Sequence, residues 1–320
     1  MQTLGEWWMW VVFFGFVVVA VVVDLVVLRS QGAHKVSAKE ATVWTLIWVA
    51  LALIFCAGLW YYLDGSVGRA VANEAATQFL TGYLIEKSLS VDNIFVFLMI
   101  FSYFAVPLEF QKRVIILGVV GAIVLRAIMI LLGAVLIAKF HWILYVFGLF
   151  LLITGIKMLV FADAAPDLES NPVLRWMRAH LRITKEFHGE QLAVQVEGKR
   201  WYTPLFAVVV LIAVTDIIFA VDSIPAIYAI TEDPFIVMTA NIFAILGLRA
   251  LYFLLADMKD RFHLLTHGLA LVLIFVGIKM LLAHWFKVPA FWSLGVVCAI
   301  LITSIVVSMM RPVHKTDAQP

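Results

Sequence analysis

Two segments of the sequence carry a pair of acidic residues at the same spacing inside otherwise apolar stretches. Glu86 and Asp92 lie in EKSLSVDNI, and Asp216 and Asp222 lie in DIIFAVDSI. Each segment therefore has a carboxylate six residues before the Asp of a Val-Asp-x-Ile core. Six residues of α-helix turn about 600° and rise about 9 Å, so the two acids of one segment lie about 120° apart around a straight helix.

The residue that follows the second acid of each segment is also an oxygen ligand. The complete candidate set is Glu86, Asp92, Asn93, Asp216, Asp222 and Ser223. Carboxylate, amide and hydroxyl oxygens suit the hard divalent cations Mg²⁺, Ca²⁺ and Mn²⁺, whereas no histidine joins either segment to favour zinc or copper. The same acids could instead relay protons, and a metal–proton exchanger would use both. These residues predict a cation pathway.

Composition places these acids in a membrane protein. Hydrophobic residues make up 64% of the 320 residues, charged residues make up 14%, and the mean hydropathy is +1.04. Soluble domains contain about 45–50% apolar and about 25% charged residues. The net charge of +2 excludes a basic nucleic-acid-binding surface, and two cysteines in separate apolar runs exclude a disulfide framework.

Nine apolar runs are long enough to cross a bilayer, which takes about 20 residues. They cover roughly 7–28, 41–63, 78–101, 114–138, 142–162, 204–230, 235–257, 265–284 and 288–310. With the N-terminus outside, fifteen loop Lys and Arg residues fall inside and three fall outside. Because positive loops stay inside, we expect an all-α polytopic membrane protein with nine transmembrane helices, N-out and C-in.

The two acidic segments open an internal repeat. Leu-Arg-Ala recurs around Arg126 and Arg249, and Gly-Ile-Lys-Met-Leu recurs at 155–159 and 277–281. Under the expected topology, helices 3–5 and helices 6–8 form two inverted three-helix units, which place a shared site at the membrane midplane and permit alternating access. A duplication that serves only a scaffold is the alternative. The expected divisions of the single membrane domain are 1–76 (two N-terminal helices), 77–162 (repeat 1), 163–203 (cytoplasmic amphipathic loop), 204–284 (repeat 2) and 285–320 (C-terminal helix and tail).

Ten charged residues inside the expected spans need partners, because each central one costs roughly 2.5–3.5 kcal/mol. We expect Arg126 and Arg249 to pair with the acids of the repeats, either permanently or only while no cation is bound. Lysines near the span ends, Lys87 among them, can reach the interface. Asp24, outside the repeat, either completes the site or makes a structural hydrogen bond.

Local sequence signals add four expectations. Either the helices of the two segments are central, with wide wet faces, or they unwind near the second acid; Pro225, which lacks an N–H, favours unwinding near Asp222 in the sixth helix. In the long connection, 172–185 resembles a basic amphipathic helix on the membrane surface, and 192–200 has a weak hairpin pattern with a turn at 197–199. Ser37 to Glu40 forms a capping box for the second helix.

The motifs EKSLSVDN, DIIFAVDSIPA and GLRALYF resemble the signatures of the TerC family of integral membrane proteins, and the resemblance covers essentially the whole chain. It implies a manganese exporter of the bacterial inner membrane, with the acids at positions 86, 92, 216 and 222 at the metal site. Tellurium resistance and an alkaline pH response are also associated with the family. We therefore expect Mn²⁺ efflux, with proton coupling, no organic cofactor, and the lipid bilayer as surroundings. A Ca²⁺/H⁺ exchanger and a non-transporting stress or redox modulator are the alternatives.

Overall fold

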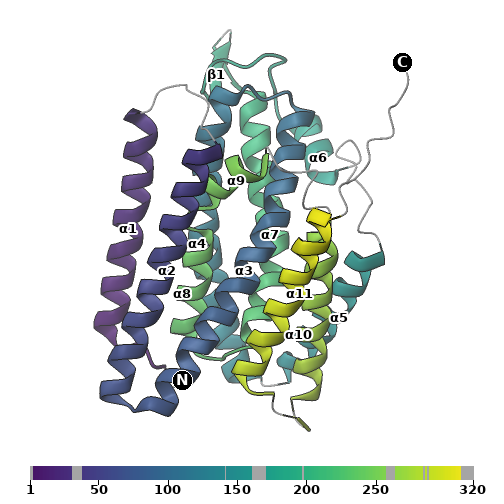
Figure 1. Cartoon of the computed structure of the whole chain (residues 1–320). Helices are drawn as coiled ribbons and strands as arrows, with labels where there is room; N and C mark the ends of the chain where they lie inside the picture. Colours follow the sequence, from purple (N-terminus) through teal and green to yellow (C-terminus); the bar gives the residue numbers. More distant parts are fainter. Residues whose placement is uncertain are drawn as a thin grey trace.

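The computed structural model describes residues 3–30, 38–140, 142–160, 171–196, 198–256, 264–283, 285–286 and 288–310. It is a bundle of long helices, with one short hairpin at one end (Figure 1). The elements are α1 (Trp7–Ser30), α2 (Ala38–Ser66), α3 (Arg69–Tyr103), α4 (Leu108–Lys139), α5 (Ile143–Val160), α6 (Pro172–His180), β1 (Ala193–Val196), β2 (Lys199–Tyr202), α7 (Pro204–Tyr228), α8 (Pro234–Ile245), α9 (Leu248–Ala256), α10 (Leu265–Leu282) and α11 (Ala290–Met310).

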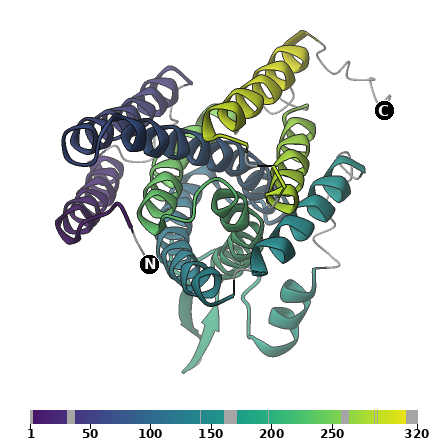
Figure 2. The ribbon, with the colours of Figure 1, turned by 90° about the horizontal axis from the view of Figure 1, so that it is seen from below.

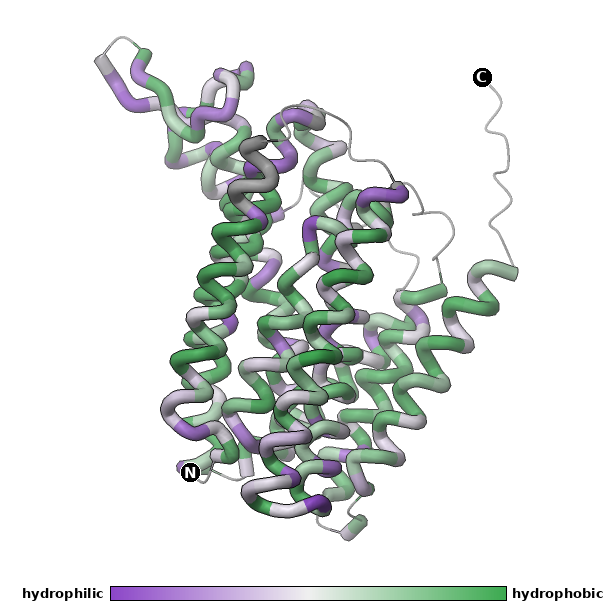
Figure 3. Tube along the Cα trace, turned by 60° about the vertical axis from the view of Figure 1, so that its left-hand side comes forward, coloured by the Kyte–Doolittle hydropathy of each residue, from purple (hydrophilic) through white to green (hydrophobic). Residues whose placement is uncertain are grey.

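The chain is a multi-pass membrane protein by the length and hydropathy of its helices. Seven described helices are long and apolar enough to cross a bilayer, and the bent pair α8 and α9 makes an eighth candidate. The 35-residue helix α3 is long enough to span but carries three charged residues, Glu86, Lys87 and Asp92, within its middle. The nine-span count depends on α3 and stays a prediction. Hydrophobic residues cover most of the helix length in Figure 3, as a lipid-facing surface requires.

Helix α1 lies at one edge of the bundle and α11 lies at the opposite edge, with α3 between them (Figures 1 and 2). Many side chains of α1 and α2 are exposed valines, leucines and isoleucines, which bilayer lipid would cover. The buried core instead gathers around α3, α7, α8 and α10. The acidic segments of the sequence analysis therefore lie on the most enclosed helices.

The expected unwinding near Pro225 is wrong, and the break falls elsewhere. Helix α7 stays continuous through Pro225, which lies in its last turn; the missing N–H removes only the hydrogen bond to the carbonyl oxygen of Val221, and only three helical residues follow the proline. The helix interruption comes between α8 and α9, which are bent by 43°. Gly247 adopts a φ of +82° there and lies directly beneath the ring of Trp48. Both the backbone angle and the lack of space require glycine at this position.

Helices α5 and α10 form an antiparallel contact through small residues. A Cβ added to Gly148 would meet the carbonyl oxygen of Gly277, and one added to Gly155 would meet the carbonyl oxygen of Ala270. Small residues let membrane helices approach closely, so that backbone and side chains of the two helices pack together. The contact joins the last helix of each predicted repeat.

A Gly277→Ala substitution should destabilise this contact. The new methyl would lie 2.8 Å from both the carbonyl oxygen of Gly148 and the amide nitrogen of Leu152, and overpacking of this kind costs about 1–3 kcal/mol. Gly295→Ala is the matched control, because nothing lies within 4 Å of its added Cβ. Thermal unfolding in detergent should show a lower midpoint for Gly277→Ala only. Equal midpoints for the two variants would contradict the contact.

The long connection contains the two predicted elements, but the helix packs differently from the expectation. In α6, Leu174 and Met177 are buried against the bundle while Trp176 is exposed. The apolar side of α6 therefore packs mainly on protein rather than on lipid. The hairpin is confirmed, since β1 and β2 pair antiparallel from Ala193–Tyr202 to Val196–Lys199. Glu197 of its turn and Ser37 of the predicted capping box lie outside the described residues.

Candidate ion-binding site

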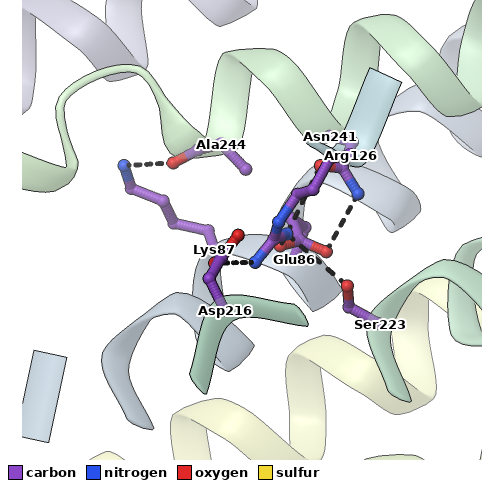
Figure 4. Close-up of polar contacts among 7 residues, drawn as sticks. All are labelled: Glu86, Lys87, Arg126, Asp216, Ser223, Asn241 and Ala244. Atoms are coloured by element: carbon purple, nitrogen blue, oxygen red, sulfur yellow. Dashed lines mark hydrogen bonds and ion pairs between the residues drawn. The ribbon is translucent and has the colours of Figure 1, made fainter. Parts of the chain in front are cut away.

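Arg126 is the centre of a buried polar cluster inside the bundle. It lies in the middle of the continuous helix α4 and is 1% exposed. Its guanidinium forms ion pairs with Glu86 of α3 and with Asp216 of α7, whose Oδ1 lies 3.2 Å from Nη2 (Figure 4). These two acids are the first acids of the two sequence segments. The structure therefore brings the equivalent carboxylates of the two segments onto one arginine.

Amide and hydroxyl groups complete the cluster. Arg126 Nη1 donates to Asn241 Oδ1 at 3.3 Å and to Ser223 Oγ at 3.5 Å. Asn241 Nδ2 in turn donates to Glu86 Oε2 at 3.2 Å. When its amide oxygen faces the arginine, Asn93 accepts from Arg126 Nη2 at 3.2 Å. Four helices, α3, α4, α7 and α8, thus contribute oxygen atoms or the guanidinium to one site.

The cluster carries more negative than positive formal charge. Two ionised carboxylates on one guanidinium leave a net charge of −1. Asp216 Oδ2 is buried and has no hydrogen-bond partner among the described residues. A buried acceptor without a partner is costly, and an uncompensated buried charge costs more. A proton or a cation would satisfy both deficits.

Lys87 contacts the broken helix rather than the membrane interface. Its Nζ donates to the carbonyl oxygen of Ala244 at 3.1 Å (Figure 4). Ala244 is the penultimate residue of α8, where carbonyls lack intrahelical partners and the helix dipole favours a positive charge. The predicted snorkelling of Lys87 is therefore wrong.

The second acids of the two segments are not part of this cluster in the described residues. Asp222 interacts with the Thr154 hydroxyl and the charge of Lys157, both on α5. Asp216 and Ser223 share a face of α7, whereas Asp222 lies about 100° away from Ser223. The side chain of Asp92 lies outside the described residues. No group of three acidic, histidine or cysteine side chains is assembled for a metal in the described part of the chain.

Among the described side chains, which do not include that of Asp92, Arg249 pairs with Asp24 and with none of the acids of the repeats, contrary to the prediction. Its Nη2 lies 2.7 Å from Oδ1 of Asp24 on α1. The break at Gly247 turns α9 away from the line of α8, so Arg249 meets α1 instead of the central cluster. Of the two roles considered for Asp24, the structure gives it a charge partner outside the candidate ligand set.

Sequence reasoning missed Asn241, which bridges Glu86 and Arg126. Its signal was a single amide in the apolar stretch PFIVMTANIFAI. A polar side chain in the middle of a membrane helix is costly unless it has a partner there. Asn241 could therefore have been added to the candidate residues on that ground.

Fold and site together define a class, a multi-pass α-helical membrane protein with a buried carboxylate–arginine cluster. The sequence profile described as "Integral membrane protein TerC family" matches residues 71–316. The chain belongs to the TerC family, which confirms the resemblance of its motifs.

Several relatives match over nearly their whole length. "Putative membrane-bound redox modulator Alx" of Escherichia coli (strain K12) is 50% identical over 308 residues, which is 96% of each chain. The protein of that name from Photorhabdus laumondii is 48% identical over 315 residues, 98% of each chain. An uncharacterized membrane protein of Myxococcus xanthus is 44% identical over 312 residues, 98% of this chain and 95% of its own. No solved structure matches the chain.

Proposed function

We propose that the chain is a transporter that exports divalent cations, Mn²⁺ in the first place, across the bacterial inner membrane in exchange for protons. The observation that carries the proposal is the position of Glu86 and Asp216 on Arg126 inside an apolar bundle. One structural ion pair would need a single acid. Two acids from equivalent positions leave a negative site that a cation or proton completes.

The oxygen atoms of this cluster favour a hard cation. Carboxylate, amide and hydroxyl oxygens surround the arginine, and hard divalent cations prefer such ligands. In the proposed cycle, Mn²⁺ displaces the guanidinium from Glu86 and Asp216, with Asn93, Ser223 and Asn241 as further ligands. Asp92 and Asp222 lie about one and two-thirds turns further along their helices, about 9 Å. Because the two helices run in opposite directions in an inverted repeat, each of these acids supplies a further binding position, one on either side of the cluster.

The contact between α5 and α10 supports an inverted repeat. The repeat places Gly155 in register with Gly277, and therefore Gly148 with Ala270. The two close approaches, Gly148 to Gly277 and Gly155 to Ala270, exchange with each other under this register. Such exchange is expected of two units related by a two-fold axis in the membrane plane. With α3 counted as a span, the two units are helices 3–5 and helices 6–8 of a nine-helix, N-out, C-in protein.

Vesicle transport tests this function against its alternatives. Purified protein in liposomes should take up Mn²⁺ faster than protein-free vesicles when an opposing proton gradient is imposed. Excess Ca²⁺ and Mg²⁺ should compete weakly. Fast Ca²⁺ uptake with little Mn²⁺ uptake would favour Ca²⁺/H⁺ exchange. Uptake no faster than in protein-free vesicles would contradict transport and favour the modulator role that the relatives' name describes.

A further inference from the structure

The two equivalent arginines of the repeats have different partners. Arg126 contacts Glu86 and Asp216 in the central cluster. Arg249, at the matching position of the second Leu-Arg-Ala, pairs with Asp24 at 2.7 Å. Asp24 belongs to α1, outside both repeats. Arg126 therefore pairs with the carboxylates of the repeats, whereas its counterpart Arg249 pairs with an acid outside them.

The helices that carry the two arginines differ in the same way. Helix α4 runs unbroken from Leu108 to Lys139. Its counterpart is divided into α8 and α9, with the bend of 43° directly before Arg249. Gly247 allows the bend through its positive φ. The two repeats thus differ in helix continuity directly before the arginine, and the bend determines the direction of Arg249.

The surroundings of Arg249 give it few alternative partners. Its side chain is 8% exposed, beside a cavity of about 20 Å³ that Trp48, Val120 and Leu246 help to line. Such a cavity holds about one water molecule. A buried guanidinium without a carboxylate is strongly unfavourable. Arg249 can therefore leave Asp24 only for another acid, and Glu86 of the central cluster lies on α3, which packs against both α8 and α9.

We propose that Arg249 is the second counter-ion of Glu86 and Asp216, and that Asp24 holds it apart while Arg126 occupies them. The inference rests on the proposed transport function. In an inverted repeat the two access states exchange the conformations of the two units. In the other state α8 and α9 then form one straight helix, as α4 does in this structure. Arg249 is paired with Glu86 and Asp216, and Arg126 is no longer paired with them. Asp24 is a positioning residue that sets the balance between the two states.

Distance measurements test the movement without any need for transport. Spin labels at Val124 on α4 and Phe253 on α9, in a Cys56→Ala/Cys298→Ala background, report how α9 lies relative to α4. Asp24→Asn should add a second distance population, because Arg249 loses the partner that holds it. If Asp24 only anchors α1, labels on α4 and α9 will keep the single wild-type distance. That result would overturn the proposal.

A charge reversal separates the exchange of arginines from simple anchoring. Asp24→Arg with Arg249→Asp keeps an ion pair between α1 and α9 but removes the second counter-ion. The wild-type label distance should return, while Mn²⁺ uptake stays about tenfold or more below wild type, within the usual range of coupling between sites. Wild-type uptake by the reversed pair would overturn the proposal. Absence of uptake by the wild-type protein would refute the transport function, and the label distances would still decide the role of Asp24.

Discussion

Arg126→Gln is expected to lower the free energy of unfolding by about 3–5 kcal/mol, because it leaves Glu86 and Asp216 as buried charges without their partner. Both carboxylates converge on this guanidinium, which is almost fully enclosed. Glutamine is shorter than arginine and supplies no charge. The two carboxylates would then repel each other and recruit a cation or a proton.

Added Mn²⁺ should therefore restore much of the stability that Arg126→Gln removes. A ligand that binds only the folded state stabilises it in proportion to the logarithm of its concentration over its Kd. Thermal unfolding in detergent, with and without Mn²⁺, measures the effect. Arg113→Gln is the control, because its ion pair with Glu190 is half exposed and such pairs contribute about 0–1 kcal/mol. A destabilised Arg126→Gln protein that does not respond to Mn²⁺ would count against cation binding at these carboxylates.

The second large effect is expected for the carboxylates themselves. Glu86→Gln and Asp216→Asn should each reduce Mn²⁺ uptake by roughly 10–100-fold or more, since even changes to the outer shell of a metal site cost that much affinity. Each substitution removes a ligand charge and keeps the shape of the side chain. Each also brings the cluster from a charge of −1 to 0, so the variants should insert and fold at least as well as wild type. Loss of assembly in both variants would favour a structural role.

The candidate residues were more predictable than their contacts. Matched spacing within the chain identified Glu86 and Asp216, and helical geometry correctly separated Asp222 from the face shared by Asp216 and Ser223. Arg126 was predicted to pair with these acids, and it does. That one arginine would bind acids from both segments depends on how α3, α4 and α7 pack, which the local pattern does not contain.

The two errors about charge partners share one physical origin in the break between α8 and α9. A single glycine inside an apolar stretch is compatible with a continuous membrane helix, so Gly247 gave no clear signal. Pro225 was the stronger breaker by composition, yet its place in the last turn of α7 makes it tolerable. The break exposes the Ala244 carbonyl that attracts Lys87, and it turns Arg249 toward Asp24. Both incorrect partners followed from assuming a straight helix there.

The most direct test of the account is the initial rate of Mn²⁺ uptake by Glu86→Gln relative to wild type at equal reconstituted density. Glu74→Gln is the matched control, since Glu74 is an exposed acid on the same helix α3. The account predicts rapid uptake by wild type and Glu74→Gln, and uptake by Glu86→Gln close to that of protein-free vesicles. Uptake by Glu86→Gln at the wild-type rate would contradict the claim that the cation passes through the Glu86–Arg126–Asp216 cluster.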